Sequence, residues 1–359
     1  MRATILTASI GAGHDLPAEV LAAELRDEHG WEVEIVDALA LVGGRVERAI
    51  TDTTFDTPWR NRVFDLEHRV LHDITLTHRI AGRLGELVTG RPLLRHLAEW
   101  RPGVVVSTYP GSTEVLGRLR RRGRVDAPTV AAVTDVAALR FWAHPGIDLH
   151  LVTQAEAIEE VREIAGQRAD VRVVRGLDDP RFANPPTRAQ ARAALDLPAD
   201  VPVAVVSGGG WAVGDLPGAT EAVLAADSRA RVTILCGSAE TLREELERRF
   251  AATGRVRAMG FTDRMPDVLG AADVLVHSTA GLTVMEAVVV GCRVISYGWG
   301  RGHIRRNNAA FVRHGLAAVV RDRAGLEQAV RDALAAPAQP DRSFAALPTA
   351  AAVIAERYG

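Results

Sequence analysis

The sequence of 359 residues contains no lysine, so all 43 of its basic residues are arginines. This absence excludes the chemistries that need a lysine amine, which are Schiff-base catalysis, pyridoxal phosphate anchoring, the P-loop and kinase-type phosphoryl transfer. Cysteine is limited to Cys236 and Cys292, both in apolar stretches. We therefore expect two buried thiols in a reducing cytoplasm and no disulfide.

Long apolar runs and an excess of charge are also absent. No run approaches the roughly 18 apolar residues of a membrane-spanning helix, and the stretch MRATILTASIGAGH is too short for a signal peptide. The balance of 43 basic and 45 acidic residues lacks the positive excess of nucleic-acid-binding proteins. The basic run 117–124 could contact an anionic membrane, but a solvated helix end is the simpler interpretation. We expect a cytoplasmic protein, with contact at the inner face of the membrane left open.

Short β-branched runs alternate with helical patterns in both halves of the chain, including a helix expected from Pro17. This alternation predicts an α/β fold of two doubly wound, Rossmann-like domains that face an interdomain crevice. The expected strands are 3–8, 32–36, 103–107, 129–133, 149–152, 201–207, 231–236, 255–259, 273–277 and 293–297.

The length exceeds that at which a single core usually keeps growing, so two domains are expected. The proline-containing segment 176–195 interrupts the pattern and predicts the boundary. We expect a first domain at 1–180 with a helical insertion at about 38–99, a second domain at 181–340 and a C-terminal helix at 341–359. The insertion would be either a substrate-specific surface or a helical cover of the core.

Three glycine-containing loops follow expected strands, at 11–14, 207–214 and 277–287. Loops at the carboxyl ends of parallel strands let backbone amides approach a ligand, although each loop alone is ordinary and none matches the dinucleotide fingerprint. The third loop, HSTAGLTVMEA, places hydroxyls and small residues at a helix N-terminus, with Glu286 further along the helix. The backbone amides of this loop would bind phosphate, and the Glu286 carboxylate would accept hydrogen bonds from ribose hydroxyls. This combination indicates a nucleoside diphosphate site.

Three segments taken in order carry a family resemblance. They are SIGAGH near the amino terminus, VTDVAALRFWAHPGIDLHLV at 133–152, and the stretch 260–295 that begins GFTDRMPDVL. The chain resembles the GT-B glycosyltransferases of the monogalactosyldiacylglycerol synthase group and, more distantly, the peptidoglycan N-acetylglucosaminyltransferase that forms lipid II. The resemblance covers nearly the whole chain and is weakest at 38–99 and after Ala335.

The resemblance implies roles for particular residues. The backbone around Phe261 and Thr262, with Met265 beyond, would bind uracil, although both Phe261 and Met265 could instead pack in the core. Glu286 would bind ribose, and His303 and Asn307 lie where the family contacts the donor sugar. His303 and Ile304 replace the usual Gln and Glu, so the identity of the sugar does not follow. The diphosphate would contact Gly208, Gly209, Gly210, Ser278, Thr279, Ala280, Gly281 and Leu282, while Gly11 and Gly13 would lie on the acceptor side.

Sugar transfer with inversion needs a base near the acceptor hydroxyl, and the pKa of histidine suits proton removal at neutral pH. His14 is the candidate, with Asp135 either orienting it or acting in its place; the alternative is that His14 only caps or packs at a helix start. Helix dipoles and amides can stabilise the departing diphosphate, so we expect neither a metal nor a cofactor.

These observations favour an inverting, metal-independent transferase that uses a nucleoside diphosphate sugar, with UDP as the expected nucleotide. The acceptor would be a hydroxyl of a lipid or a small natural product, and nucleic acid is not an expected partner. Two alternatives stay open: a hydrolysing UDP-sugar epimerase, or a non-catalytic nucleotide-sugar binding protein. The insertion at 38–99 favours the transferase, because an epimerase has no second substrate to accommodate.

Overall fold

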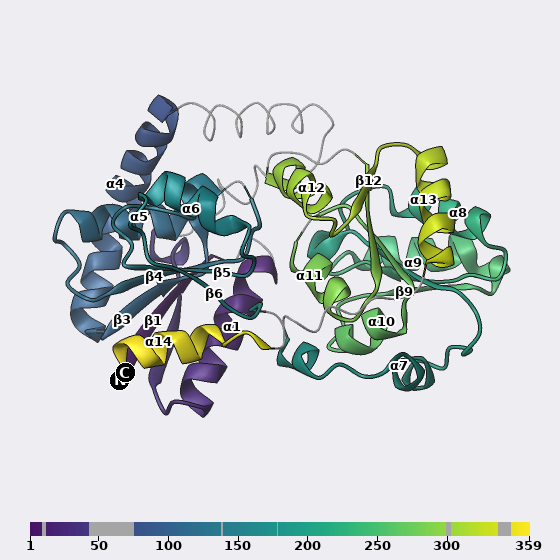
Figure 1. Ribbon diagram of the computed structural model, residues 1–359, viewed down its shortest axis with the longest axis horizontal. Coiled ribbons are helices and arrows are strands. Elements are labelled where there is room, and N and C mark those ends of the chain that lie inside the picture. The colour runs from purple at the N-terminus through teal and green to yellow at the C-terminus, as the bar shows by residue number, and fades with distance from the viewer. Residues whose placement is uncertain are drawn as a thin grey trace. The chain divides into compact units, whose positions relative to one another are not determined.

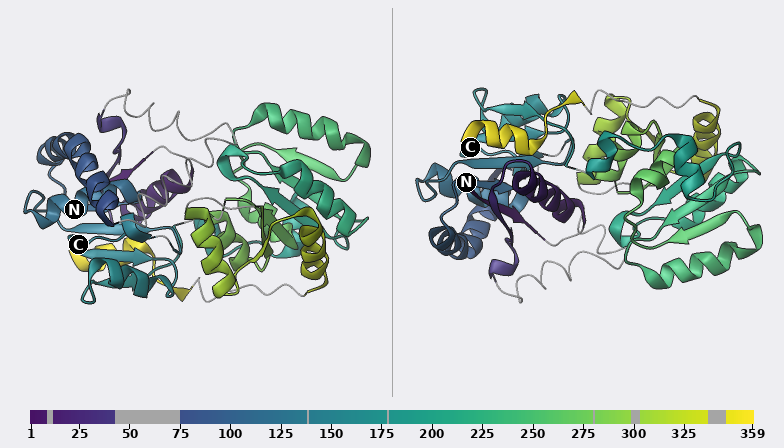
Figure 2. Two further views of the ribbon diagram at one scale, coloured as in Figure 1. Left: turned by 90° about the horizontal axis from the view of Figure 1, so that it is seen from above. Right: turned by 90° about the horizontal axis from the view of Figure 1, so that it is seen from below.

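The computed structural model describes residues 1–8, 12–42, 75–137, 139–177, 179–279, 281–298, 303–336 and 346–359. The chain divides into two compact units, each with a six-stranded parallel sheet covered by helices (Figures 1 and 2). Unit 1 comprises Met1–Asp178, Arg301–His303 and Leu347–Gly359, and unit 2 comprises Asp179–Gly300 and Ile304–Ala346. The α/β class expected from the alternating pattern is confirmed.

The sheet of unit 1 has the strand order β2-β1-β3-β4-β5-β6, and all neighbouring strands are parallel. The chain moves outward from β1 to β2, then crosses back and continues from β3 to β6 in the other direction. The carboxyl ends of β1 and β3 therefore mark the point where strand order reverses. The strands are β1 (Arg2–Thr7), β2 (Glu32–Asp37), β3 (Val104–Ser107), β4 (Thr129–Val133), β5 (Leu149–Val152) and β6 (Val171–Val173).

Helices cover both faces of this sheet. On one face, α1 (Ala12–Asp27) and α14 (Ala350–Tyr358) pack into one apolar core with Trp31, and Figure 1 shows these two helices lying side by side. The opposite face carries a second core, built with side chains of α4 (Thr75–Trp100), α5 (Pro110–Arg121) and α6 (Ala157–Ala165). Two short 3-10 helices, η1 (Ala40–Val42) and η2 (Leu139–Phe141), lie in connections.

Helix α1 begins at Ala12, so the expected start at Pro17 is wrong. Thr7 Oγ1 donates to Asp15 Oδ1 at 3.0 Å. The Asp15 carboxylate lies in the first turn, where its negative charge interacts favourably with the positive end of the helix dipole. His14 consequently lies in the first turn of the helix. At the other end of the chain, α14 begins at Ala350, where Thr349 Oγ1 accepts the Ala352 N–H at 3.0 Å, so the helix occupies only the end of the segment 341–359.

The sheet of unit 2 has the order β12-β11-β10-β7-β8-β9 and is also parallel throughout. Its strands are β7 (Val203–Ser207), β8 (Arg231–Leu235), β9 (Val256–Met259), β10 (Val274–His277), β11 (Arg293–Tyr297) and β12 (Ala318–Val320). Its helices are η3 (Pro180–Ala183), α7 (Arg188–Ala194), η4 (Gly209–Trp211), α8 (Leu216–Ala226), α9 (Glu240–Phe250), η5 (Ala251–Thr253), α10 (Met265–Ala271), α11 (Leu282–Val289), α12 (His303–Arg313) and α13 (Arg323–Ala335).

A buried ion pair fixes the amino ends of β7 and β10. Asp273 Oδ2, just before β10, accepts the Val203 N–H at 2.8 Å and Nη2 of Arg192 at 2.9 Å. Arg192 is almost fully buried and its Nε also donates to the Ala271 carbonyl at 3.1 Å. The two strands are thus held in register at one end, which fixes where their carboxyl ends emerge.

Both cysteines are free and buried, which confirms the expectation of unpaired thiols. Within the described ranges, no helix combines the length and apolar character needed to cross a membrane.

Candidate functional site

The most distinctive edge in unit 2 lies at the carboxyl ends of β7 and β10. Strands β8 and β9 follow β7 toward one edge of the sheet, and strands β11 and β12 follow β10 toward the opposite edge. β7 and β10 are direct neighbours, with Ser207 opposite His277. Open α/β sheets bind ligands at such a reversal of strand order, so the loops that follow these two strands form the candidate site.

The loops after β7 and β10 touch each other. A Cβ added at Gly209 would lie 3.1 Å from the Thr279 side chain, and Ser278 Oγ donates to the Val213 carbonyl. Gly209 has a φ of +68°, a conformation that favours glycine. The structure thus brings the predicted diphosphate residues Gly208–Gly210 together with Ser278 and Thr279.

The row of loops continues along the same edge. The Gly210 carbonyl accepts both the N–H and the Oγ–H of Ser238, each at 3.0 Å, and a Cβ at Gly237 would lie 2.3 Å from that carbonyl oxygen. A Cβ at Gly260 would lie 3.6 Å from the Gly237 carbonyl oxygen. The loops after β10, β7, β8 and β9 therefore lie in one row. The loop after β10 touches the loop after β7 through the side chains of Ser278 and Thr279, and Phe261 follows directly at the other end of the row.

Helix α11 begins next to this row. Gly281 is its N-cap and supplies no side-chain acceptor, so the first amides of the helix, from Leu282 onward, are not capped by that residue. Glu286 lies in the second turn and is only 4% exposed. This arrangement can offer amides and the positive end of a helix to an anion. Ala280 lies outside the described residues.

Phe261 and Met265 differ in their surroundings. The Phe261 side chain is 68% exposed, so the alternative that it packs in the core is wrong. Met265 is the first residue of α10 and is half-buried. Thr262 Oγ1 accepts the Arg264 N–H at 3.1 Å and so shapes the turn that leads into α10. The loop backbone at 261–262 follows β9 at the same edge as the glycine row.

The two residues predicted to contact the donor sugar both lie in α12. Asn307 is almost fully buried, while His303 is the first residue of the helix and its side chain lies outside the described residues. Their contact with a sugar stays a prediction.

In unit 1, the predicted catalytic residues both follow the carboxyl ends of strands, and His14 follows β1, where strand order reverses. His14 follows β1 in the first turn of α1, and Asp135 lies two residues after β4. Asp135 Oδ2 accepts the indole N–H of the buried Trp142 at 2.8 Å, which fixes that carboxylate. The side chain of His14 and all of Gly11 lie outside the description, and Gly13 is part of α1. The roles of these residues stay predictions.

A buried hydroxyl cluster at the end of β3 was not predicted. Ser107 Oγ lies 2.8 Å from Ser112 Oγ and accepts the hydroxyl of Thr113 at 2.9 Å. Burial, together with the nearby charge of Asp37, raises the pKa of Tyr109 in the same turn. The sequence signal that could have predicted this cluster is the hydroxyl-rich run STYPGST, which begins at the end of the β-branched strand β3. This strand lies at the point where strand order reverses.

The arginines of the basic run 117–124 are largely engaged inside unit 1. Arg118 pairs with Glu86 and Glu114, Arg120 pairs with Asp148, and Arg122 pairs with Glu86. The interpretation of this run as a solvated helix end is therefore wrong for Arg118 and Arg120, whereas the Arg122 side chain is 51% exposed. Within the parts of the chain described, no group of three His, Cys, Asp or Glu residues could hold a metal ion.

The fold is that of known GT-B structures. The chain superposes on MurG of Acinetobacter baumannii with a TM-score of 0.60 and 15% identity, covering 99% of each chain. It superposes on the glycosyltransferase SnogD of Streptomyces nogalater with a TM-score of 0.54 and 18% identity, covering 99% of this chain and 98% of the other. The expected GT-B fold is confirmed.

Sequence comparison places the chain within that fold. Residues 62–176 match the monogalactosyldiacylglycerol (MGDG) synthase family, and residues 213–336 match the family of glycosyl transferases group 1. Together these two matches support a GT-B glycosyltransferase similar to the MGDG synthase group. The first match includes the end of the segment 38–99, where the resemblance was expected to be weakest.

Two characterised relatives of this GT-B protein illustrate the group. The processive diacylglycerol beta-glucosyltransferase of Bacillus subtilis is 27% identical over 257 residues, which is 70% of this chain and 64% of the relative. MGDG synthase 1 of Arabidopsis thaliana, a chloroplastic protein, is 23% identical over 336 residues, or 87% of this chain and 60% of the relative. The chain thus spans less than two thirds of the length of these relatives.

Proposed function

We propose that this protein transfers a sugar from a nucleoside diphosphate sugar, with UDP as the nucleotide, to a lipid hydroxyl, with inversion and without a metal ion. The observation that carries the proposal is the row of neighbouring glycine and hydroxyl loops at the strand-order reversal of unit 2. The names of the relatives, a diacylglycerol glucosyltransferase and an MGDG synthase, favour diacylglycerol as the acceptor class.

The donor would bind along that row in a definite order. The diphosphate would lie against Gly208–Gly210, Ser278 and the N-terminus of α11, where Thr279 adds a hydroxyl donor. Glu286 would accept hydrogen bonds from the ribose hydroxyls. The backbone at Phe261 and Thr262 would bind the uracil edge, with Met265 beyond.

The chemistry then needs one base and one stabilised leaving group. The acceptor oxygen attacks the anomeric carbon, the bond from that carbon to the diphosphate oxygen breaks, and the acceptor proton passes to His14. Asp135, whose Oδ2 accepts the Trp142 indole N–H, would orient that base or replace it. The amides and helix dipole at α11 would stabilise the charge that develops on the diphosphate, which is the role a metal would otherwise fill.

A lipid acceptor requires contact with a membrane surface, and α4 offers a suitable face. Four apolar side chains with helical spacing are exposed on it: Ile80 (49%), Leu84 (57%), Leu87 (74%) and Val88 (44%). Arg91 and Arg95 continue the same face and are exposed. An apolar stripe that is followed by arginines is suited to an interface of anionic lipid.

The test of transfer uses purified protein, diacylglycerol in anionic vesicles, and UDP-glucose, UDP-galactose or UDP-N-acetylglucosamine in the presence of EDTA. We expect a β-linked glycolipid from one of these α-linked donors, identified by NMR of the anomeric proton. Release of free sugar or an epimerised product without any glycolipid would favour the hydrolysing epimerase. Binding of UDP without turnover of any donor would favour a binding protein.

Two sets of variants separate the roles of the residues. His14→Ala is expected to abolish transfer and to leave UDP binding intact, and Asp135→Asn tests whether the carboxylate supports or replaces that base. For the membrane, Leu87→Glu should weaken flotation with anionic vesicles, while Val312→Glu should leave it unchanged. Val312 is a matched control, because it is also an exposed apolar residue on a helix, 55% exposed against 74% for Leu87.

A further inference from the structure

A pocket of about 500 Å³ opens on the helix-covered face of unit 1, separate from the proposed donor site in unit 2. It is lined by residues of α4, α5, α6 and the connection between β4 and β5, which includes η2. The residues of its wall that matter here are Arg118, Arg121, Arg140, His144, Glu114 and Glu163. Nothing in the proposed transfer reaction uses this pocket.

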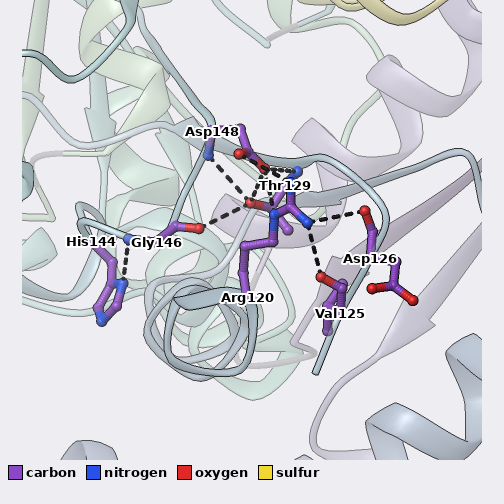
Figure 3. A network of polar contacts seen from close by, with 7 residues as sticks. All are labelled: Arg120, Val125, Asp126, Thr129, His144, Gly146 and Asp148. Carbon is purple, nitrogen blue, oxygen red and sulfur yellow. Dashed lines mark hydrogen bonds and ion pairs between the residues drawn. The ribbon is translucent and has the colours of Figure 1, made fainter. Parts of the chain in front are cut away.

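His144 presents an N–H donor in this wall. Burial lowers its pKa to about 4, with Arg118 and Arg121 nearby adding to the effect, so the ring is neutral at pH 7. The Gly146 N–H donates to Nδ1 at 2.9 Å, which places the ring proton of the neutral form on Nε2. Figure 3 shows the second ring nitrogen pointing away from Gly146.

Close backbone packing holds this ring in position. A Cβ at Gly117 of α5 would lie 2.4 Å from His144 Nδ1, and a Cβ at Gly146 would lie 2.0 Å from the Gly117 carbonyl oxygen. Only glycine at both positions lets the connection lie this close to α5. Asp148, two residues further on, is bound by Arg120 and Thr129 and anchors the end of the connection (Figure 3).

Two arginines of the wall are not engaged. The guanidinium groups of Arg121 and Arg140 make no hydrogen bond or ion pair within the described part of the chain. Arg118 differs, because its Nε donates to Glu86 at 3.1 Å and its Nη1 donates to Glu114 at 3.2 Å. Two free guanidinium groups and the Nε2–H of His144 therefore supply donors for an anion.

The same wall also contains acceptors. Glu114 is buried, and its Oε2 has no hydrogen-bond partner; His78 Nε2 lies 3.8 Å from it. Burial raises the pKa of this carboxyl. Glu163 is exposed at the same pocket. A bare anion would leave Glu114 Oε2 without a donor, whereas a ligand with hydroxyl groups would supply one.

We infer that this pocket binds a phosphate ester of a small polyol. The phosphate would contact Arg121, Arg140 and Nε2–H of His144, while hydroxyls of the polyol would donate to Glu114 and Glu163. The volume is within the range of small-molecule sites, roughly 300–1,000 Å³. A soluble ester such as glycerol 3-phosphate and the headgroup of phosphatidylglycerol share this chemistry.

The test measures binding of the full chain to three probes. Calorimetry follows glycerol 3-phosphate and inorganic phosphate, and flotation follows phosphatidylcholine vesicles with and without phosphatidylglycerol. We expect the ester to bind more tightly than inorganic phosphate, because only the ester carries hydroxyls. The Arg121→Gln and Arg140→Gln changes should each weaken binding about tenfold, or about 1.4 kcal/mol. Binding of phosphatidylglycerol vesicles alone, weakened by these changes, would identify the lipid headgroup as the source.

The controls separate the pocket from general charge effects and from the donor site. Arg168→Gln removes an exposed arginine of the same unit that does not line the pocket, and should leave binding unchanged. UDP binding, measured in parallel, should be unaffected by all three variants, and melting temperatures verify folding. The inference is overturned if neither ester nor vesicles bind, if Arg168→Gln weakens binding as much as the pocket variants, or if inorganic phosphate binds as tightly as the ester.

Discussion

Asp148 at the start of β5 is the residue whose removal should disturb unit 1 most clearly. Its carboxylate accepts four hydrogen bonds, from Thr129 N at 2.8 Å, Thr129 Oγ1 at 3.0 Å, Arg120 Nε at 3.0 Å and Arg120 Nη2 at 3.3 Å (Figure 3). Arg120 also donates to the carbonyls of Val125 and Asp126, both at 3.0 Å. Asp148→Ala therefore releases the start of β4 and the end of α5 together.

The size of the effect follows from these bonds and their exposure. Hydrogen bonds to a charged group contribute about 1.5–3 kcal/mol each when well shielded. Arg120 and Asp148 are 29% and 34% exposed, so water replaces part of what is lost. We expect Asp148→Ala to lower the free energy of unfolding by about 2–4 kcal/mol, and the melting temperature by roughly 10 °C.

Scanning calorimetry measures the effect, with Asp126→Ala as the matched control. Asp126 belongs to the same network through its backbone carbonyl, and Figure 3 shows its carboxylate outside the network. Its truncation should change stability by no more than about 0.5 kcal/mol. Equal melting temperatures for the two variants would refute the reasoning, because the network would then not depend on the Asp148 carboxylate.

Three further predictions concern other features. Gly117→Ala should lower the free energy of unfolding, measured by urea titration, by about 1–3 kcal/mol, because the new Cβ would enter the space of the His144 ring. The control Gly85→Ala should be neutral or slightly stabilising, because its Cβ would meet Val115 at an ordinary 3.4 Å. Burial lowers the pKa values of His144, His150 and His277 to about 4, so on acidification the unfolded chain binds protons at these residues before the folded chain does. The free energy of unfolding should therefore be constant above about pH 6.5 and decrease as the pH is lowered from about 6.5 to about 4. An increase in the free energy of unfolding as the pH is lowered over that range would contradict this prediction. Burial raises the pKa values of the Cys236 and Cys292 thiols, so a thiol reagent at pH 8 should modify neither cysteine in the native protein and both in denaturant. Rapid labelling of the native protein would contradict this prediction, because it would show that the thiols are accessible.

Much of the fold could be predicted because its strands are buried on both faces. Val203–Ser207 and Thr129–Val133 are fully buried and read as unbroken β-branched and small runs, which is the pattern of parallel sheets. β6 and β12 were not predicted, because each has three residues at a sheet edge and lacks such a run. The start of α1 was misplaced because glycine and proline normally interrupt helices, yet here Gly13 and Pro17 lie within the first turns of one.

The candidate site was predictable in composition but not in geometry. The loops at Gly208–Gly210 and at Ser278–Thr279 stand out as glycine and hydroxyl residues after strands, but their contact depends on β7 and β10 being neighbours. The pairing of Asp135 with Trp142 and the pocket beside His144 depend on how the connection between β4 and β5 folds back on α5. No spacing in the sequence indicates that fold-back.

Calorimetric titration of the purified protein with UDP in EDTA tests the central claim most directly. The account predicts saturable binding without metal, weakened about 10- to 100-fold by Glu286→Ala, since a hydrogen bond to a charged group contributes about 1.5–3 kcal/mol. Glu240→Ala, which truncates a glutamate exposed on α9, should bind like the parent. Failure to bind UDP, or equal binding by the Glu286→Ala variant and the parent, would contradict the assignment of the donor site to the strand-order reversal of unit 2.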